Sequence, residues 1–140
     1  MRLEITRKAD LATRALLELD RRARTADPPP RAKAADLARS VGTTAGFLTQ
    51  VMSPLLAQGW VRSEPGPTGG YVVATDLADL SVLQVIEAVE GPTDTGRCVL
   101  EERTCAGGGT CALHVPWSRA RGQLTAEMSR TSLASIAGAA

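Results

Sequence analysis

Three cysteines and a histidine are the residues of this chain best suited to bind a metal. Cys98, Cys105 and Cys111 are its only cysteines, and His114 is its only histidine. All four occur in one short, glycine-rich segment with the spacing C-x6-C-x5-C-x2-H. Thiolates and neutral imidazole are the ligands that iron–sulfur clusters and zinc use. The sequence therefore predicts a metal centre in this segment.

The spacing favours an iron–sulfur cluster. Gaps of six and five residues let a flexible loop approach a cluster from three sides, whereas zinc fingers prefer a C-x2-C pair, which the sequence lacks. Zinc binding and free, redox-active thiols are the alternative interpretations. Cys111 and His114 also resemble a nucleophile and its base, but no third orienting residue is evident, so we do not expect an enzyme.

Composition indicates one domain, with at most a small appendage. The chain has 140 residues, of which 44% are hydrophobic, so it can bury a substantial core. Neither a signal peptide nor an apolar run of about 18 residues is evident, and the cysteine count is odd. We therefore expect a cytoplasmic protein in a reducing environment, without a disulfide framework and without a membrane partner.

Charge is distributed unevenly along the chain. Residues 1–63 contain eleven Lys and Arg against six Asp and Glu, a balance of +5, whereas residues 64–140 contain five against nine, a balance of −4. A basic half joined to an acidic half is typical of a DNA-binding module with a regulatory appendage. Ordinary solvated helix faces are the other interpretation of this asymmetry.

Local patterns in the basic half predict a helix-turn-helix. Apolar residues recur at helical spacing in residues 7–24 and again in residues 32–40. Gly42 ends the second helix, and Thr43 or Thr44 can cap a third that continues through Leu56. Pro54 is expected to kink or locally break that third helix, because it removes a backbone donor.

A β-hairpin is predicted after these helices. Residues 59–64 and 71–74 have strand character, and the glycine- and proline-rich residues 65–70 form the turn between them. Helix-turn-helix followed by hairpin is the order of a winged helix, and we expect its core to be complete by Ala74. The expected fold class is mainly α, with a small β-hairpin wing.

The second half should carry the metal segment and a long helix. Ser81 and Gln84 form a capping-box pattern that begins a helix, residues 93–112 are loop-like, and residues 117–132 form the last long helix. Its narrow apolar stripe comprises Leu113, Trp117, Ala120, Leu124 and Met128. Such a stripe needs a partner, either its own domain or a second copy of the chain. We expect a DNA-binding domain over residues 1–80 and a metal-binding and dimerisation region over residues 81–140.

Polar residues of the predicted winged helix are candidates for DNA contact. On the third helix, Gln50 can bond bidentately to adenine, and Thr49 and Ser53 can reach base edges. The remaining candidates would meet the DNA backbone or minor groove, and they are Thr43, Thr44, Arg62, Thr68 and Gly69.

Several motifs in this order resemble the Rrf-two family of winged-helix transcription regulators. They are MRL at residues 1–3, DLATRAL at 10–16, FLTQV at 47–51, GPTGGY at 66–71 and VIEAVEG at 85–91, followed by the three-cysteine segment. The resemblance covers nearly the whole chain. It implies a homodimer joined through the long C-terminal helix, a cluster loop beside that helix, and a double-stranded DNA operator as partner.

The resemblance also implies two candidates for the fourth cluster ligand. His114 matches the histidine that completes a 2Fe–2S site in some members, and Asp10 matches a carboxylate, given by the other subunit, that completes a 4Fe–4S site in others. Gln50 matches a base-facing glutamine, whereas Thr49 stands where the members with a 2Fe–2S site completed by histidine have glutamate. The expected function is operator binding controlled by an iron–sulfur cluster that senses redox state, nitric oxide or cluster supply. A cluster-free thiol-redox or zinc regulator and an iron–sulfur electron-transfer protein are the alternatives.

Overall fold

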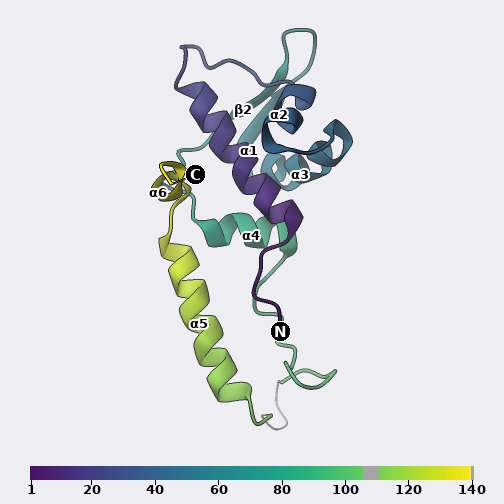
Figure 1. Cartoon of the computed structure of the whole chain (residues 1–140), viewed down its shortest axis with the longest axis vertical. Coiled ribbons are helices and arrows are strands. Elements are labelled where there is room, and N and C mark those ends of the chain that lie inside the picture. Colours follow the sequence, from purple (N-terminus) through teal and green to yellow (C-terminus); the bar gives the residue numbers. More distant parts are fainter. Residues whose placement is uncertain (106–110, 140) are drawn as a thin grey trace.

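The computed structural model of the chain describes residues 1–105 and 111–139. Over these residues the protein has helices α1 to α6 and one antiparallel pair of strands, in the order α1-α2-α3-β1-β2-α4-α5-α6. The helix-turn-helix and the hairpin lie at one end of the molecule, and the start of α5 lies at the other (Figure 1). The predicted fold class, a mainly helical winged helix with a long helix near the C-terminus, is confirmed.

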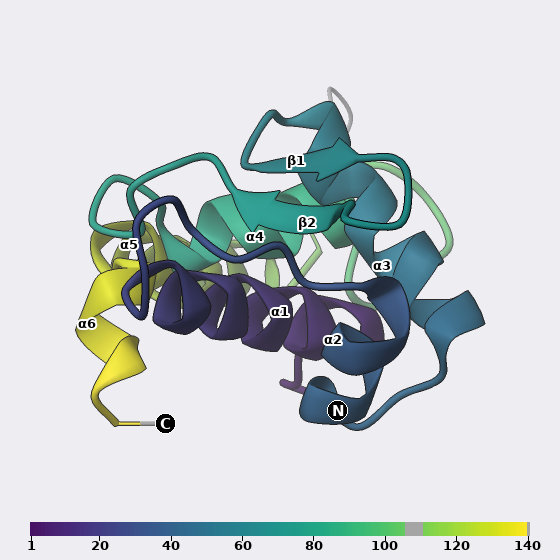
Figure 2. The same cartoon turned by 90° about the horizontal axis from the view of Figure 1, so that it is seen from above.

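Helix α1 (Arg7–Ala23) forms the centre of the core. Its N-cap is Thr6, whose hydroxyl accepts a hydrogen bond from the Ala9 N–H at 3.2 Å. Apolar residues recur every three or four positions along it, and the buried ones are Ala9, Leu11, Ala12, Ala15, Leu16 and Leu19. This face packs against α2, α3, α4 and β2, so α1 is covered on several sides (Figure 2).

Helices α2 (Ala34–Val41) and α3 (Ala45–Ala57) form the predicted helix-turn-helix. Gly42 ends α2 with φ of +79°, a left-handed conformation that glycine adopts without steric penalty. Thr44 then caps α3 by accepting a hydrogen bond from the Phe47 N–H. Of the two effects expected of Pro54, a kink or a local break, the break was wrong, because α3 continues through Pro54 to Ala57. The carbonyl that loses its donor belongs to Gln50, an exposed residue.

The wing consists of β1 (Val61–Glu64) and β2 (Gly70–Val73), in the register Val61 opposite Val73. Ala32 pairs with the other side of β2 as an isolated β-bridge, because it exchanges backbone hydrogen bonds with Tyr71 at 2.9 and 2.8 Å. Gly70 has φ of +144°, and a Cβ on it would lie 2.5 Å from the Ala32 carbonyl oxygen. Only glycine therefore allows β2 to pass this close to the segment that enters α2.

The core continues beyond the hairpin. Helix α4 (Val82–Glu90) begins with the predicted capping box of Ser81 and Gln84. Leu77, Leu80, Val85 and Leu133 are all at most 1% exposed and belong to the same buried cluster as α1 and α3. The expectation of a core complete by Ala74 was wrong, because the chain returns near its C-terminal end to fill it.

Helix α5 (His114–Arg130) confirms the predicted long helix but differs at both ends. It begins three residues before the expected start, and extended backbone at Thr131 separates it from a short helix, α6 (Leu133–Ala137). The Thr131 carbonyl accepts from the Val82 N–H at 2.9 Å, and the Leu133 N–H donates to the Leu80 carbonyl at 2.8 Å. No residue of α5, which the structure describes completely, is buried. Across the described ranges, no helix combines the length and apolar character that a bilayer span needs.

Candidate metal centre and nucleic-acid interface

The cysteine loop (residues 91–113) brings the three cysteine side chains together. The Sγ atoms of Cys98, Cys105 and Cys111 all lie within 4.8 Å of one another, and all three thiols are free. Two backbone hydrogen bonds position the first pair, from the Cys98 N–H to the Arg103 carbonyl and from the Cys105 N–H to the Gly96 carbonyl. The clustering predicted from the cysteine spacing is therefore present in the fold.

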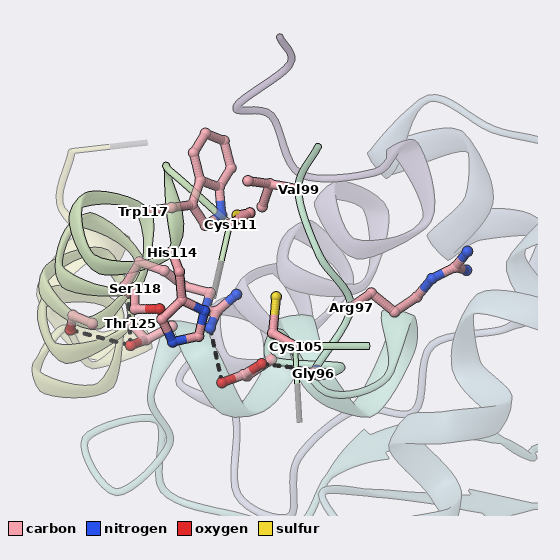
Figure 3. Close-up of a pocket in the computed structure, with 12 residues that line it drawn as sticks. Gly96, Arg97, Val99, Cys105, Cys111, His114, Trp117, Ser118 and Thr125 are labelled. Atoms are coloured by element: carbon pink, nitrogen blue, oxygen red, sulfur yellow. Dashed lines mark hydrogen bonds and ion pairs between the residues drawn. The ribbon is translucent and has the colours of Figure 1, made fainter. Parts of the chain in front are cut away.

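Cys111 is placed by the helix that follows it. Its carbonyl accepts a hydrogen bond from the His114 N–H at 3.0 Å, so it directly precedes the first turn of α5. In Figure 3 Cys111 lies beside the indole of Trp117, whereas the guanidinium group of Arg97 points away from the sulfurs. One sulfur thus comes from the start of the long helix and two come from the loop before it.

The thiols differ in how readily they ionise. Hydrogen bonding from the backbone at Leu100 lowers the pKa of Cys98, whereas burial raises the pKa of Cys105, as does its neighbour Cys98. Thiols bind metals as thiolates, so the surroundings of Cys98 favour its metal-binding form.

An open pocket of about 440 Å³ separates this loop from α5 (Figure 3). Cys105, Cys111, His114 and Trp117 are among its lining residues. The ring nitrogens of His114 do not belong to the cluster of ligand atoms within 4.8 Å, as far as the described residues show. The structure thus places His114 beside the cysteines and not among them.

An ion pair that the sequence did not indicate connects the loop to α5. Arg121 Nη2 lies 3.0 Å from Asp94 Oδ2, and the other carboxylate oxygen of Asp94 accepts from the Gly96 N–H at 2.9 Å. Both charged residues line the same pocket as the cysteines. The partners are 27 residues apart, so no local pattern could have revealed them.

Asp10, the second candidate for a fourth ligand, lies on α1, and in the part of the chain that the structure describes it does not belong to the cluster of ligand atoms within 4.8 Å. Its carboxylate pairs with Arg14 at 2.9 Å and with Arg7 at 3.7 Å. Its side chain is 30% exposed, so one side remains open to solvent or to a second chain.

Three of the candidate DNA contacts are exposed on one helix, α3. Thr49, Gln50 and Ser53 are exposed, whereas Leu48, Val51, Met52 and Leu55 of the same helix are buried. The Thr49 hydroxyl donates to the Ala45 carbonyl at 3.0 Å. Thr44 is exposed as the N-cap, and Thr43 is half-buried. The polar face of α3 therefore points outward as a continuous strip.

The wing presents a second group of candidates. Arg62 and Thr68 are exposed, but Gly69 is buried inside the turn. The Gly69 N–H donates to the Gly66 carbonyl, and a Cβ on Gly69 would lie 2.1 Å from the Glu64 carbonyl oxygen. Gly69 thus has a structural part in closing the turn, which leaves Arg62 and Thr68 as the exposed side chains.

Comparisons with known proteins place the whole chain in one family. A family model described as Rrf2, iron-dependent transcriptional regulator, matches residues 5–139. The HTH-type transcriptional regulator IscR of Photorhabdus laumondii is 31% identical over 131 residues, which cover 94% of this chain and 77% of that protein. IscR of Escherichia coli O1:K1 / APEC is 31% identical over 134 residues, with 96% and 80% covered.

Solved structures have the same fold. CymR, the global cysteine regulator of B. subtilis, has a TM-score of 0.75 at 20% identity, with 99% of both chains covered. IscR of T. potens has a TM-score of 0.73 at 19% identity, with 96% of this chain and 85% of that chain covered. The described elements and the extent of these matches lead to one conclusion: the chain belongs to the Rrf2 family of DNA-binding transcription regulators, which are not enzymes.

Proposed function

We propose that this regulator binds its operator under the control of an iron–sulfur cluster. The observation that carries the proposal is the meeting of three free thiols within 4.8 Å, at the junction of the cysteine loop and α5. Relatives about 30% identical are named IscR, and the matching family model is described as iron-dependent. The signal would be redox state, nitric oxide or cluster supply.

The donor set of the cysteine loop suits such a cluster. Cys98, Cys105 and Cys111 would each provide a thiolate, and either His114 of the same chain or Asp10 of a second chain would complete a 2Fe–2S or 4Fe–4S site. When bound, the cluster supplies iron that reacts with oxidants and with nitric oxide. The lowered pKa of the Cys98 thiol favours its thiolate, and the ion pair of Arg121 with Asp94 holds the loop next to α5.

Operator recognition would use the exposed side of the winged helix. Helix α3 would enter the major groove, where Gln50 reads a base and Thr49 and Ser53 contact neighbouring edges. Thr43, Thr44, Arg62 and Thr68 would meet phosphates or the minor groove, and Gly69 would contribute by holding the turn that carries Thr68. Two copies of the chain, paired through α5, would present two such surfaces to a roughly palindromic site in the cytoplasm.

Single replacement of each cysteine by alanine tests the metal centre. We expect protein purified without oxygen to be brown and to contain iron and sulfide. Each Cys→Ala variant should lose the visible absorption, because removal of one of four ligands exposes iron to solvent. Ser118→Ala is the matched control, since Ser118 lines the same pocket and has no thiol. Full iron content in all three cysteine variants would refute the proposal.

Operator binding by the loaded and metal-free forms tests the regulatory role. We expect their affinities for one operator to differ at least about tenfold, which corresponds to about 1.4 kcal/mol. Affinity for a scrambled duplex should change less, because phosphate contacts dominate it. A colourless protein that contains stoichiometric zinc, or one whose operator affinity follows thiol oxidation alone, would support the alternative regulators. Equal operator affinities would favour the electron-transfer interpretation.

A further inference from the structure

The last turn of α4 carries two carboxylates, and each binds a backbone N–H of another segment. Glu87 Oε1 accepts from the Thr93 N–H at 2.9 Å, at the beginning of the cysteine loop. Glu90 Oε1 accepts from the Thr6 N–H at 2.7 Å, at the cap of α1. The dipole of a helix disfavours negative charge at its C-terminus, so these two hydrogen bonds offset an unfavourable placement. One helix end thus holds both the cysteine loop and the start of α1.

Arg7, the residue after Thr6, reaches the helix-turn-helix. Its Nη2 donates to the Gly42 carbonyl at 3.0 Å, across 35 residues of sequence. Gly42 forms the left-handed turn between α2 and α3, and Thr44, two residues later, caps α3. A shift of Arg7 would therefore act at the turn that sets where α3 begins.

The cysteine loop is joined to the same helix end. Residues from Thr93 to Gly96 are fixed by Glu87 on α4 and by the ion pair of Asp94 with Arg121 on α5. Gly96 in turn accepts the N–H of Cys105, one of the clustered cysteines. A shift of the cysteine segment would therefore reach the end of α4 through the hydrogen bond of the Thr93 N–H to the Glu87 carboxylate.

We propose that Arg7 is a positioning residue, through which the state of the cysteine loop alters operator binding. Glu90 supports Arg7 by fixing the backbone of the preceding residue, Thr6. This inference rests on the proposed function. The Arg7 side chain is 63% exposed, so its hydrogen bond to the Gly42 carbonyl can be broken and replaced by bonds to water at low cost. Arg7 makes two contacts at once, with Nη1 at 3.7 Å from Asp10 Oδ2 on α1 and Nη2 on the Gly42 carbonyl. A shift of the backbone at Thr6 would therefore change how Arg7 joins α1 to the turn before α3.

The test compares the ratio of operator affinities of the loaded and metal-free full-length protein. Arg7→Ala should reduce this ratio at least about threefold, or about 0.7 kcal/mol. Arg14→Ala is the matched control, because it also removes a positive charge and an ion pair with Asp10 but leaves the Gly42 contact. It should change the ratio less than about twofold. A general loss of DNA affinity, which is measured on a scrambled duplex, lowers the affinity of both forms equally and therefore cancels in the ratio.

Glu90 provides an independent pair of variants. Glu90→Ala removes the acceptor for the Thr6 N–H and should reduce the ratio as Arg7→Ala does. Glu90→Gln keeps an acceptor oxygen and should preserve most of the ratio. An unchanged ratio in Arg7→Ala, or an equal loss in Arg14→Ala, would overturn this inference while the cluster-controlled function stands. A ratio of one in the unmodified protein would instead overturn the proposed function and the inference together.

Discussion

Glu18 lies on α1 between the guanidinium groups of Arg21 and Arg22, at 2.8 and 2.7 Å. Its side chain is only 17% exposed, and the hydrogen bond from Arg21 is the main reason why its pKa falls from 4.5 to about 2. A carboxyl group whose pKa is lower in the folded protein adds stability above its unfolded pKa. That contribution is lost as the pH falls from about 4.5 towards about 2.

Replacement of this carboxylate should therefore have a pH-dependent effect. Glu18→Gln should lower the free energy of unfolding by about 1–2 kcal/mol near pH 7 and by much less near pH 2.5, as measured by urea denaturation. Asp36→Asn is the control, because its pair with Arg39 is exposed on both sides, and it should cost less than about 0.5 kcal/mol. Equal losses at both pH values would contradict the assignment of the effect to charge.

At the scale of residues, residue types and local spacing in the sequence predicted part of the site, whereas contacts between residues far apart in the sequence could not be predicted. The cysteine spacing predicted the cluster of sulfurs because the residues that shape the loop lie within it. The hydrogen bond from Thr6 to Glu90 joins residues 84 apart, and that from Arg7 to Gly42 joins residues 35 apart. No sequence pattern indicates such a pair. The position of His114 beside the sulfurs likewise depends on how α5 begins.

At the scale of elements, caps and turns were predictable because each is decided within a few residues. Thr44, Gly42 and the Ser81–Gln84 box all function as their residue types indicate. Helix α6 was missed, because the end of α5 depends on backbone hydrogen bonds to residues 80 and 82, some fifty positions earlier. Pro54 did not break α3, since packing of the buried face of α3 outweighs one lost hydrogen bond.

The contribution of α6 to the core can be measured directly. Leu133 is fully buried among α1 and α4 residues, so Leu133→Ala should lower the free energy of unfolding by about 2–5 kcal/mol in reduced, metal-free protein. Leu100→Ala, at a residue that is 58% exposed, should lower it by less than about 0.5 kcal/mol. Comparable effects of the two variants on guanidinium denaturation would show that α6 is not part of the cooperative core.

At the scale of the molecule, the two ends differ in what they leave exposed. The end with the helix-turn-helix is the basic half of the chain and has a well-covered core around α1. The other end consists of α5, the cysteine loop and the N-terminal segment before α1 (Figure 1). Large apolar side chains of these three segments are exposed. They include Leu3, Ile5, Val99, Leu100, Leu113, Val115 and Leu124, each at least 38% exposed. Apolar groups that gather in this way are typical of a surface that another chain covers.

The proposed pairing of two copies through α5 would explain that exposure. Leu124 is 48% exposed at the middle of the predicted stripe, so Leu124→Glu should place a charge inside the interface. In sedimentation experiments we expect the unmodified protein to be a dimer and Leu124→Glu to be largely a monomer. Gln123→Glu introduces the same charge one position away, about 100° around the helix, and should remain a dimer. Because a palindromic operator needs two wings, Leu124→Glu should also lose specific DNA binding while its helices stay folded. If the unmodified protein were a monomer both with and without metal, dimerisation through α5 would be refuted, and a different partner would have to cover the apolar face of α5.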